Sequence, residues 1–271
     1  MWLFDILQDE QNIHRDRVVV PYNSQDEEHR RSLDRMIAED IQLPITQNCR
    51  NAYENALKYN NSPFIKLVGS QLMNQSTCSS CGHSALNKEP LGNMIVLTLL
   101  EAKGKRQSLD SLLQSECELA PLEAAQCDEC KARDTRSRKI LFSHLPDYLV
   151  FQLKKAQGGV LGRSVNNVQV DFPEVLDMAK YTWLSTEDEF SERVLPEQKP
   201  PFLYDCYAVI QHRGSPSSGH YWTLSRRVDK HNRWTSEWHE FSDSIVNPGK
   251  TFAHTQSINS VVMLYRRQGR D

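Results

Sequence analysis

Two short cysteine pairs constrain the fold of this chain more than any other feature of its sequence. Cys78 and Cys81 are separated by two residues, and so are Cys127 and Cys130. This spacing lets a tight turn direct both sulfurs of a pair toward one ion, and four thiolates complete a tetrahedral shell around Zn²⁺. We therefore predict a structural zinc site. Residues 82–126 connect the two cysteine pairs and are expected to extend from this site and return to it as a long finger-like segment. The alternative is a chance occurrence of free thiols.

The composition of the 271 residues is that of a globular protein and argues against several classes. Apolar residues make up 39% and charged residues 25%, and the formal net charge of −3 is close to neutral. Proteins that bind nucleic acid through phosphate contacts usually carry a basic surplus, so we expect no nucleic-acid partner. The longest apolar run, residues 94–100, is much shorter than the roughly 18 residues of a membrane span, so we expect no membrane partner.

The amino terminus, MWLFDILQDE, does not resemble a signal peptide. It lacks a basic start, and Asp5 interrupts its apolar run. Without secretion, the seven cysteines are interpreted as metal ligands or thiols and not as disulfides. We expect a cytoplasmic and/or nuclear protein.

Local patterns place helices before strands. Helical composition predicts helices over residues 26–40 and 51–59, and Ala52, Tyr53 and Leu57 are candidate buried residues of the second. Another helix is predicted over residues 109–119. Strands are predicted over residues 94–100, 140–153 with a break at Pro146, 166–172, 204–211, 219–225, 238–241 and 260–266. This order predicts an α+β fold with a mostly antiparallel sheet and not alternating βαβ units.

A second group of chemically active residues lies in the carboxyl-terminal third. A predicted strand ends at His212, a loop of Gly, Ser and Pro follows, and Gly219 and His220 open the next strand. A histidine at the edge of a sheet is well placed as a general base, and glycine lets backbone or substrate approach closely. Ser242 and Asp243 follow a later strand and could hold His220 in one tautomer, as the third member of a triad does. A purely structural histidine is the alternative.

Residues 204–222 resemble the histidine box of the ubiquitin-specific protease family (peptidase C19) of deubiquitinating enzymes. That box consists of a tyrosine, an Ala-Val strand, His-x-Gly, a short loop and Gly-His-Tyr. Each of these is present, with Cys206 in place of a usual aliphatic residue. The resemblance extends in family order from about residue 51 to residue 267. The other matching segments are residues 61–72, 78–83, 89–100, 127–131, 145–154, 170–173 and 264–267.

The resemblance implies a papain-like cysteine-protease hand with fingers, palm and thumb. It assigns residues 1–72 to a partial thumb, residues 73–140 to fingers with a zinc ribbon, and residues 141–267 to a palm with the histidine box. In the family, the fingers hold the body of ubiquitin, and its tail runs between palm and thumb. The implied partners are therefore ubiquitin and ubiquitinated proteins, and the implied cofactor is structural zinc.

The resemblance also implies roles for individual residues. His220 matches the general base, Ser242 stands at the position of the residue that orients it, and Asp243 beside it shares that role. The implied substrate-binding residues are His212, Gly219 and Tyr221. The implied zinc ligands are Cys78, Cys81, Cys127 and Cys130.

One element of the family pattern is not found in the sequence. The family's nucleophile is a cysteine in an Asn-Thr-Cys-Tyr-like box well upstream of the fingers. Cys49 has a passing likeness to that box but stands at the wrong point in family order, while Cys117 and Cys206 fall in the fingers excursion and in a palm strand. We therefore expect an N-terminally incomplete deubiquitinase domain that is inactive as this chain. The alternatives are a non-catalytic ubiquitin-binding module and, disfavoured by the net charge, a zinc-ribbon nucleic-acid binder.

Overall fold

The computed structural model describes residues 45–100, 106–159, 162–185, 198–215, 218–231 and 233–269. The helix predicted over residues 26–40 lies outside this part of the chain. The chain divides into two compact units. The first comprises residues 1–93, 117–146 and 179–201, and the second comprises residues 94–116, 147–178 and 202–271. Among the described residues, no helix is both long and apolar enough to cross a membrane.

Two helices precede the sheet of the first unit. The helix α3 (Ile45–Leu57) follows directly after a proline, and its buried side chains recur three and four residues apart along one face. These side chains are Thr46, Asn48, Cys49, Ala52 and Tyr53. The helix α4 (Pro63–Val68) has Ser62 as its N-cap, whose hydroxyl accepts a hydrogen bond from the backbone N–H of Ile65 at 3.0 Å.

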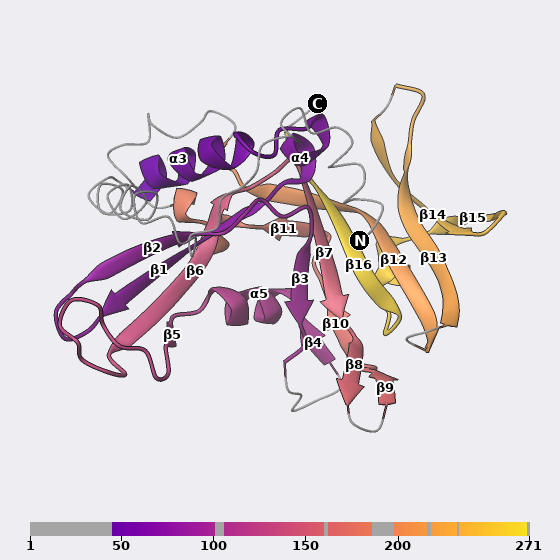
Figure 1. Ribbon diagram of the computed structural model, residues 1–271. Helices are drawn as coiled ribbons and strands as arrows, with labels where there is room; N and C mark the ends of the chain where they lie inside the picture. The colour runs from indigo at the N-terminus through magenta and orange to yellow at the C-terminus, as the bar shows by residue number, and fades with distance from the viewer. Residues whose placement is uncertain are drawn as a thin grey trace. The chain divides into compact units, whose positions relative to one another are not determined.

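A four-stranded antiparallel sheet forms the rest of the first unit (Figure 1). Its strands, in spatial order, are β2 (Ser84–Lys88), β1 (Gln71–Cys78), β6 (Arg136–His144) and β5 (Ala120–Pro121). The end of β1 is paired with the start of β6, because Cys78 lies opposite Arg136. This pairing brings both cysteine pairs to the same end of the sheet. Two 3₁₀ turns, η1 (Ala179–Tyr181) and η2 (Trp183–Ser185), follow in the chain.

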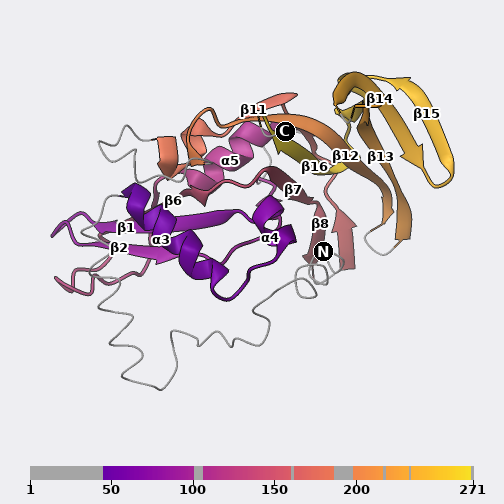
Figure 2. The same ribbon diagram turned by 90° about the horizontal axis from the view of Figure 1, so that it is seen from above.

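The second unit is built on an eight-stranded sheet, and Figure 2 shows β14 and β15 at one edge of it. The strand order is β15-β14-β13-β12-β16-β7-β3, and β11 also pairs with β12. All these pairs are antiparallel except β3 with β7. The strands are β3 (Ile95–Thr98), β7 (Tyr148–Lys154), β11 (Val175–Asp177), β12 (Leu203–Ser215), β13 (Ser218–Val228), β14 (Trp234–Ser242), β15 (Ile245–Lys250) and β16 (Ser260–Arg267).

Large aromatic side chains form much of the core of this sheet. Phe151, Tyr204, Trp238 and Tyr265 are fully buried, one each on β7, β12, β14 and β16. The smaller elements of this region are the helix α5 (Leu109–Cys117), the parallel pair β4 (Arg106–Ser108) and β10 (Gln169–Asp171), the hairpin of β8 (Ala156–Gly159) and β9 (Gly162–Val165), and the 3₁₀ turn η5 (Phe252–Thr255). The burial of these large aromatic rings contributes to the stability of the sheet.

The predicted α+β fold with mostly antiparallel sheets is confirmed. The predicted break at Pro146 separates β6 from β7, and α5 occupies most of the predicted helix over residues 109–119. The helix α3 starts at Ile45, six residues before the predicted start at residue 51. The strands β1 and β2 were not predicted, because polar residues dominate their sequences, and β15 was not predicted because Pro248 and Gly249 indicate a turn.

Candidate functional site

The four cysteines of the two pairs form one cluster in the first unit. The sulfur atoms of Cys78, Cys81, Cys127 and Cys130 all lie within 4.8 Å of one another. The Sγ atoms of Cys78 and Cys130 are 3.8 Å apart, and those of Cys81 and Cys127 are 3.7 Å apart. A disulfide would bring two sulfurs to about 2.05 Å, so these cysteines are free thiols.

The spacing of the sulfurs fits a tetrahedral zinc ion. Zn–S bonds of about 2.3 Å place the ligands of a regular tetrahedron about 3.8 Å apart. Two of the sulfur pairs have this separation within 0.1 Å. The cluster could therefore hold a metal, and a set of four sulfurs favours Zn²⁺ over the harder cations that prefer oxygen.

Two consecutive residues of the chain contact both halves of the cluster. The hydroxyl oxygen of Thr135 lies 3.3 Å from Sγ of Cys78, and this contact lowers the pKa of the Cys78 thiol to about 6. The guanidinium of Arg136 donates a hydrogen bond of 2.6 Å to the hydroxyl of Ser76 and one of 3.2 Å to the carboxylate of Asp128. Asp128 lies between the cysteines of the second pair, so residues 135–136 hold both pairs in position.

The second site is on the sheet of the second unit. His220 on β13 and Ser242 at the end of β14 are close in space, with 2.7 Å between Nε2 of the ring and the hydroxyl oxygen. Asp243 occupies the turn after β14 with a positive φ of 50°, and its carboxylate oxygen is 3.9 Å from Nδ1 of His220. The side chain of His220 is 50% exposed, so the ring is accessible to a reacting group.

His212 and Tyr221 lie on the opposite face of the same hairpin. They are directly paired between β12 and β13, and their ring centroids are 4.2 Å apart. Tyr221 and His220 are consecutive residues of a strand, so their side chains point to opposite faces. The ring of His212 also occupies the space beside Gly219, where an added Cβ would lie 2.2 Å from Nε2. The sequence predicted room for backbone or substrate at Gly219, and the structure shows that the ring of His212 fills it.

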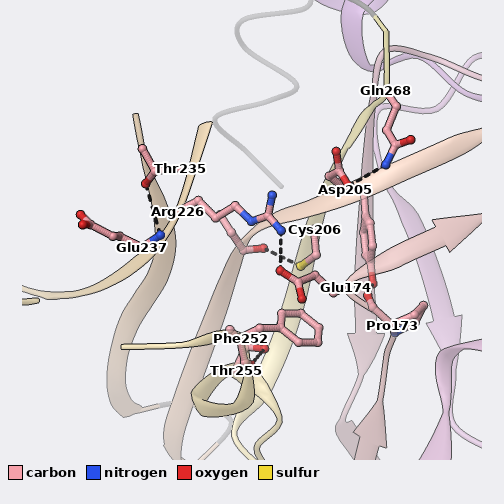
Figure 3. Close-up of polar contacts among 12 residues, drawn as sticks. Pro173, Glu174, Asp205, Cys206, Arg226, Thr235, Glu237, Phe252, Thr255 and Gln268 are labelled. Atoms are coloured by element: carbon pink, nitrogen blue, oxygen red, sulfur yellow. Dashed lines mark hydrogen bonds and ion pairs between the residues drawn. The ribbon is translucent and has the colours of Figure 1, made fainter. Parts of the chain in front are cut away.

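The three remaining cysteines are buried and lack the surroundings of a nucleophile. Cys49 is 1% exposed, and burial raises the pKa of its thiol to about 12. Cys117 is also buried. Burial raises the pKa of Cys206 even further, and Figure 3 shows it beside the ion pair of Arg226 with Glu174. Cys206 also lies seven residues along β12 from the position opposite His220, a distance of roughly 23 Å at about 3.3 Å per residue.

Solved structures with a similar fold belong to deubiquitinating modules. The SAGA DUB module bound to ubiquitin aldehyde aligns with a TM-score of 0.60 and 20% sequence identity, over 76% of this chain and 42% of that chain. The same module bound to monoubiquitin aligns with a TM-score of 0.60 and 18% identity over the same shares of each chain. This likeness shows that the described part of the chain shares the fold of those structures.

Sequence comparisons define the family. The family described as ubiquitin carboxyl-terminal hydrolase matches residues 8–265, so the chain belongs to this family. Ubiquitin carboxyl-terminal hydrolase 2 of Gallus gallus is 26% identical over 82% of this chain and 58% of its own length. Ubiquitin carboxyl-terminal hydrolase Usp2 of Drosophila melanogaster is 25% identical over 84% of this chain and 22% of its own length. The chain thus spans between a fifth and three fifths of these relatives.

Sequence reasoning found the cysteine cluster and brought His220, Ser242 and Asp243 together. It missed Thr135 and Arg136, which contact the two cysteine pairs or residues beside them. Thr135 and Arg136 follow Cys130 by five and six residues, and this short distance along the sequence was the available signal. Residues so close in sequence to a metal ligand are also close to the metal site in space. It also missed that His212 and Gly219 are in contact.

Proposed function

We propose that this domain serves the thiol-dependent hydrolysis of isopeptide bonds at the carboxyl terminus of ubiquitin. His220 is the general base, and Ser242 orients it. The observation that carries this proposal is the 2.7 Å contact between Nε2 of His220 and the hydroxyl of Ser242. The two residues occupy the positions of base and orienting residue in the family resemblance, and the family membership supports the same reaction.

In this proposal each ring nitrogen of His220 has its own role. With Nε2 of His220 held by Ser242, Nδ1 is the atom that takes the proton of a cysteine thiol. The thiolate attacks the carbonyl carbon of the terminal glycine of ubiquitin, and the C–N bond breaks as the ring returns its proton to the leaving amine. Water then hydrolyses the thioester, which releases the carboxylate and restores the thiol. Asp243 shares the orienting role, since its carboxylate oxygen lies 3.9 Å from Nδ1 of the same ring.

We propose no cysteine of this sequence as the nucleophile. Cys49, Cys117 and Cys206 are buried, and the other four cysteines belong to the cluster. A nucleophilic cysteine needs a lowered pKa and access to its base, whereas burial raises the pKa of Cys49 and of Cys206. Residues 1–271 by themselves are therefore expected to show no turnover. The same observation favours the second candidate, a non-catalytic ubiquitin-binding module.

The remaining assignments complete the proposal. Zn²⁺ bound by the four clustered cysteines would supply a structural cross-link and no step of the reaction. Residues 1–72, 73–140 and 141–267 correspond to partial thumb, fingers and palm, and His212, Gly219 and Tyr221 contact the ubiquitin tail. The partners are ubiquitin and ubiquitinated proteins, with no nucleic acid or membrane, and the location is cytoplasmic and/or nuclear.

One experiment separates the two candidates. Residues 1–271 are incubated with a fluorogenic ubiquitin substrate and with an electrophilic ubiquitin probe, and ubiquitin binding is measured in parallel. Binding without turnover or labelling fits both candidates. A fusion to the amino-terminal segment of a relative that carries the nucleophile then decides between them. Cleavage that disappears in His220→Ala supports the hydrolase, and a folded fusion without cleavage supports the binding module. Probe labelling at Cys49 contradicts both.

A further inference from the structure

The indole of Trp222 lies beside the ring of His220 on the same strand. Trp222 follows His220 by two residues on β13, so the two side chains point to the same face of the sheet. Their ring centroids are 5.9 Å apart, and the two ring planes are inclined by only 16°. Both values are typical of offset stacking between aromatic rings. In the part of the chain that the structure describes, no other ring is stacked on His220.

Trp222 is also a neighbour of Ser242 across the two strands. The register pairs Thr223 of β13 with Phe241 of β14. One step further along these antiparallel strands, Trp222 and Ser242 therefore lie side by side on the same face. The contact of 2.7 Å between Nε2 of His220 and the hydroxyl of Ser242 thus has the indole of Trp222 next to both of its partners.

On its other side, Trp222 has a neighbour that is itself held in place. Trp222 is directly paired with Gln211 of β12, and directly paired residues have their side chains on the same face. Gln211 is buried, and its side-chain amide donates to the carbonyl of His254 at 3.2 Å and lies 3.3 Å from the hydroxyl of Ser260. A neighbour fixed by hydrogen bonds restricts the movement of the indole away from His220.

The other groups around His220 constrain the plane of its ring only weakly. The side chain of His220 is 50% exposed, and the carboxylate of Asp243, 3.9 Å from Nδ1, belongs to a side chain that is mostly in solvent. Tyr221 points to the opposite face, where its ring contacts His212. The hydroxyl of Ser242 can rotate about its C–O bond, so one hydrogen bond to it does not fix a ring plane. A flat contact with an indole supplies the constraint that a hydroxyl lacks.

We propose that Trp222 is a positioning residue, which holds the imidazole of His220 in the plane where Nε2 meets the hydroxyl of Ser242. This inference rests on the proposed function, in which His220 is the general base. With the ring held in this plane, the tautomer with its proton on Nε2 is favoured, and Nδ1 stays free to accept the proton of a thiol. Trp222 acts through His220 and contacts no reacting atom.

The test measures the tautomer ratio of the neutral His220 ring in residues 1–271 by ¹⁵N NMR. Trp222→Leu removes the aromatic plane and keeps an apolar side chain. We expect it to shift the ratio away from the Nε2–H tautomer by about twofold or more, the change in equilibrium that corresponds to a weak aromatic pair. Trp222→Phe keeps a ring and should retain the ratio of the parent. Trp234→Leu is the matched control, because the ring of Trp234 contacts Tyr207, and it should leave the ratio unchanged.

Several outcomes would overturn the proposal. A tryptophan with a purely structural role would change the Tm in Trp222→Leu and leave the tautomer ratio of His220 as in the parent. An equal shift of the ratio in Trp234→Leu would show a general loosening of the sheet. The effect of Trp222→Leu should also disappear in the Ser242→Ala background, and an effect of full size there contradicts the proposal. In the unsubstituted chain, the absence of a nuclear Overhauser effect between the ring protons of His220 and Trp222 overturns it as well.

The tautomer ratio of His220 can be measured without a nucleophile, so failure of this inference and failure of the proposed function are distinguishable. In the fusion that restores the nucleophile, Trp222→Leu should lower kcat and leave KM nearly unchanged. Absence of cleavage by the parent fusion counts against the proposed function. Cleavage by the parent fusion together with a parent-like kcat and tautomer ratio in Trp222→Leu counts against the role of Trp222 alone.

Discussion

Substitution of Gly219 by alanine tests the contact between Gly219 and His212. The added Cβ would lie 2.2 Å from Nε2 of His212 and 2.7 Å from the backbone oxygen of Arg213. An ordinary contact begins at 3.4 Å, so the ring must retreat by 3.4 − 2.2 = 1.2 Å, and the backbone oxygen must also move. This movement disturbs the tilted ring contact between His212 and Tyr221, and such aromatic contacts are typically worth about 0.5–1.5 kcal/mol.

Overpacking of this kind costs about 1–3 kcal/mol. At roughly 2–4 °C per kcal/mol for a protein of this size, Gly219→Ala should lower the Tm by about 2–12 °C. Thermal unfolding measures this loss, and the double variant with His212→Ala is the matched control. We expect the cost of Gly219→Ala to be smaller in the His212→Ala background, because the ring is gone. An unchanged Tm, or the same cost in both backgrounds, would refute the reasoning.

Four further predictions concern the cysteine cluster, the contact between His220 and Ser242, and the buried Lys155. Cys78→Ser should abolish the thiolate charge-transfer absorption of the Co²⁺-loaded protein and lower the Tm, whereas the ring signals of His220 should not change. Thr135→Val should weaken metal binding about tenfold in chelator competition while Thr135→Ser does not, and equal affinities would contradict a role for the hydroxyl. Ser242→Ala should change the tautomer ratio of His220 in ¹⁵N NMR, with a Tm change of only about 1–2 °C because the site is exposed. Burial lowers the pKa of Lys155 to about 8, so above that pH the unfolded chain binds more protons at this residue than the folded chain does. The free energy of unfolding of the parent, relative to that of Lys155→Met, should therefore rise from about pH 8 to pH 10. A difference that does not change over this pH range would contradict the expectation.

Much of the fold was predictable because local pattern and tertiary structure agree. The apolar runs of β7, β12 and β16 predict strands, and Pro146 marks the predicted break between β6 and β7. The cysteine cluster was predictable because the Cys-x-x-Cys spacing places both sulfurs of a pair on the same side of a tight turn, where they can bind one ion. In these elements the sequence itself contains the signal.

Other features depend on contacts that no local pattern encodes. The strand β15 contains Pro248 and Gly249, which predict a turn, but proline is tolerated at the edge of a sheet, where its missing N–H faces solvent. The contact between Gly219 and His212 could not be predicted from local pattern, because the ring that lies beside Gly219 belongs to the neighbouring strand. The contacts of Thr135 and Arg136 with the cluster arise only once β1 and β6 have paired.

The position of the cysteine cluster at the end of the pair β1 and β6 has a consequence for how the fold selects one strand alignment. Cys78 lies directly opposite Arg136, so a slip of one residue between the strands would move the first cysteine pair by about 3.3 Å relative to the second. Bound metal would therefore fix the register at the polar ends of the two strands, where residues 75–77 pair with residues 137–139 and the side chains specify the register only weakly. Joining Cys81 to Cys127, 46 residues apart, also removes loop-closure entropy from the unfolded chain, worth about 4 kcal/mol by the relation for covalent cross-links. The cluster would thus act as a reversible cross-link. Loss of metal should allow misaligned forms of this sheet to appear before the second unit unfolds.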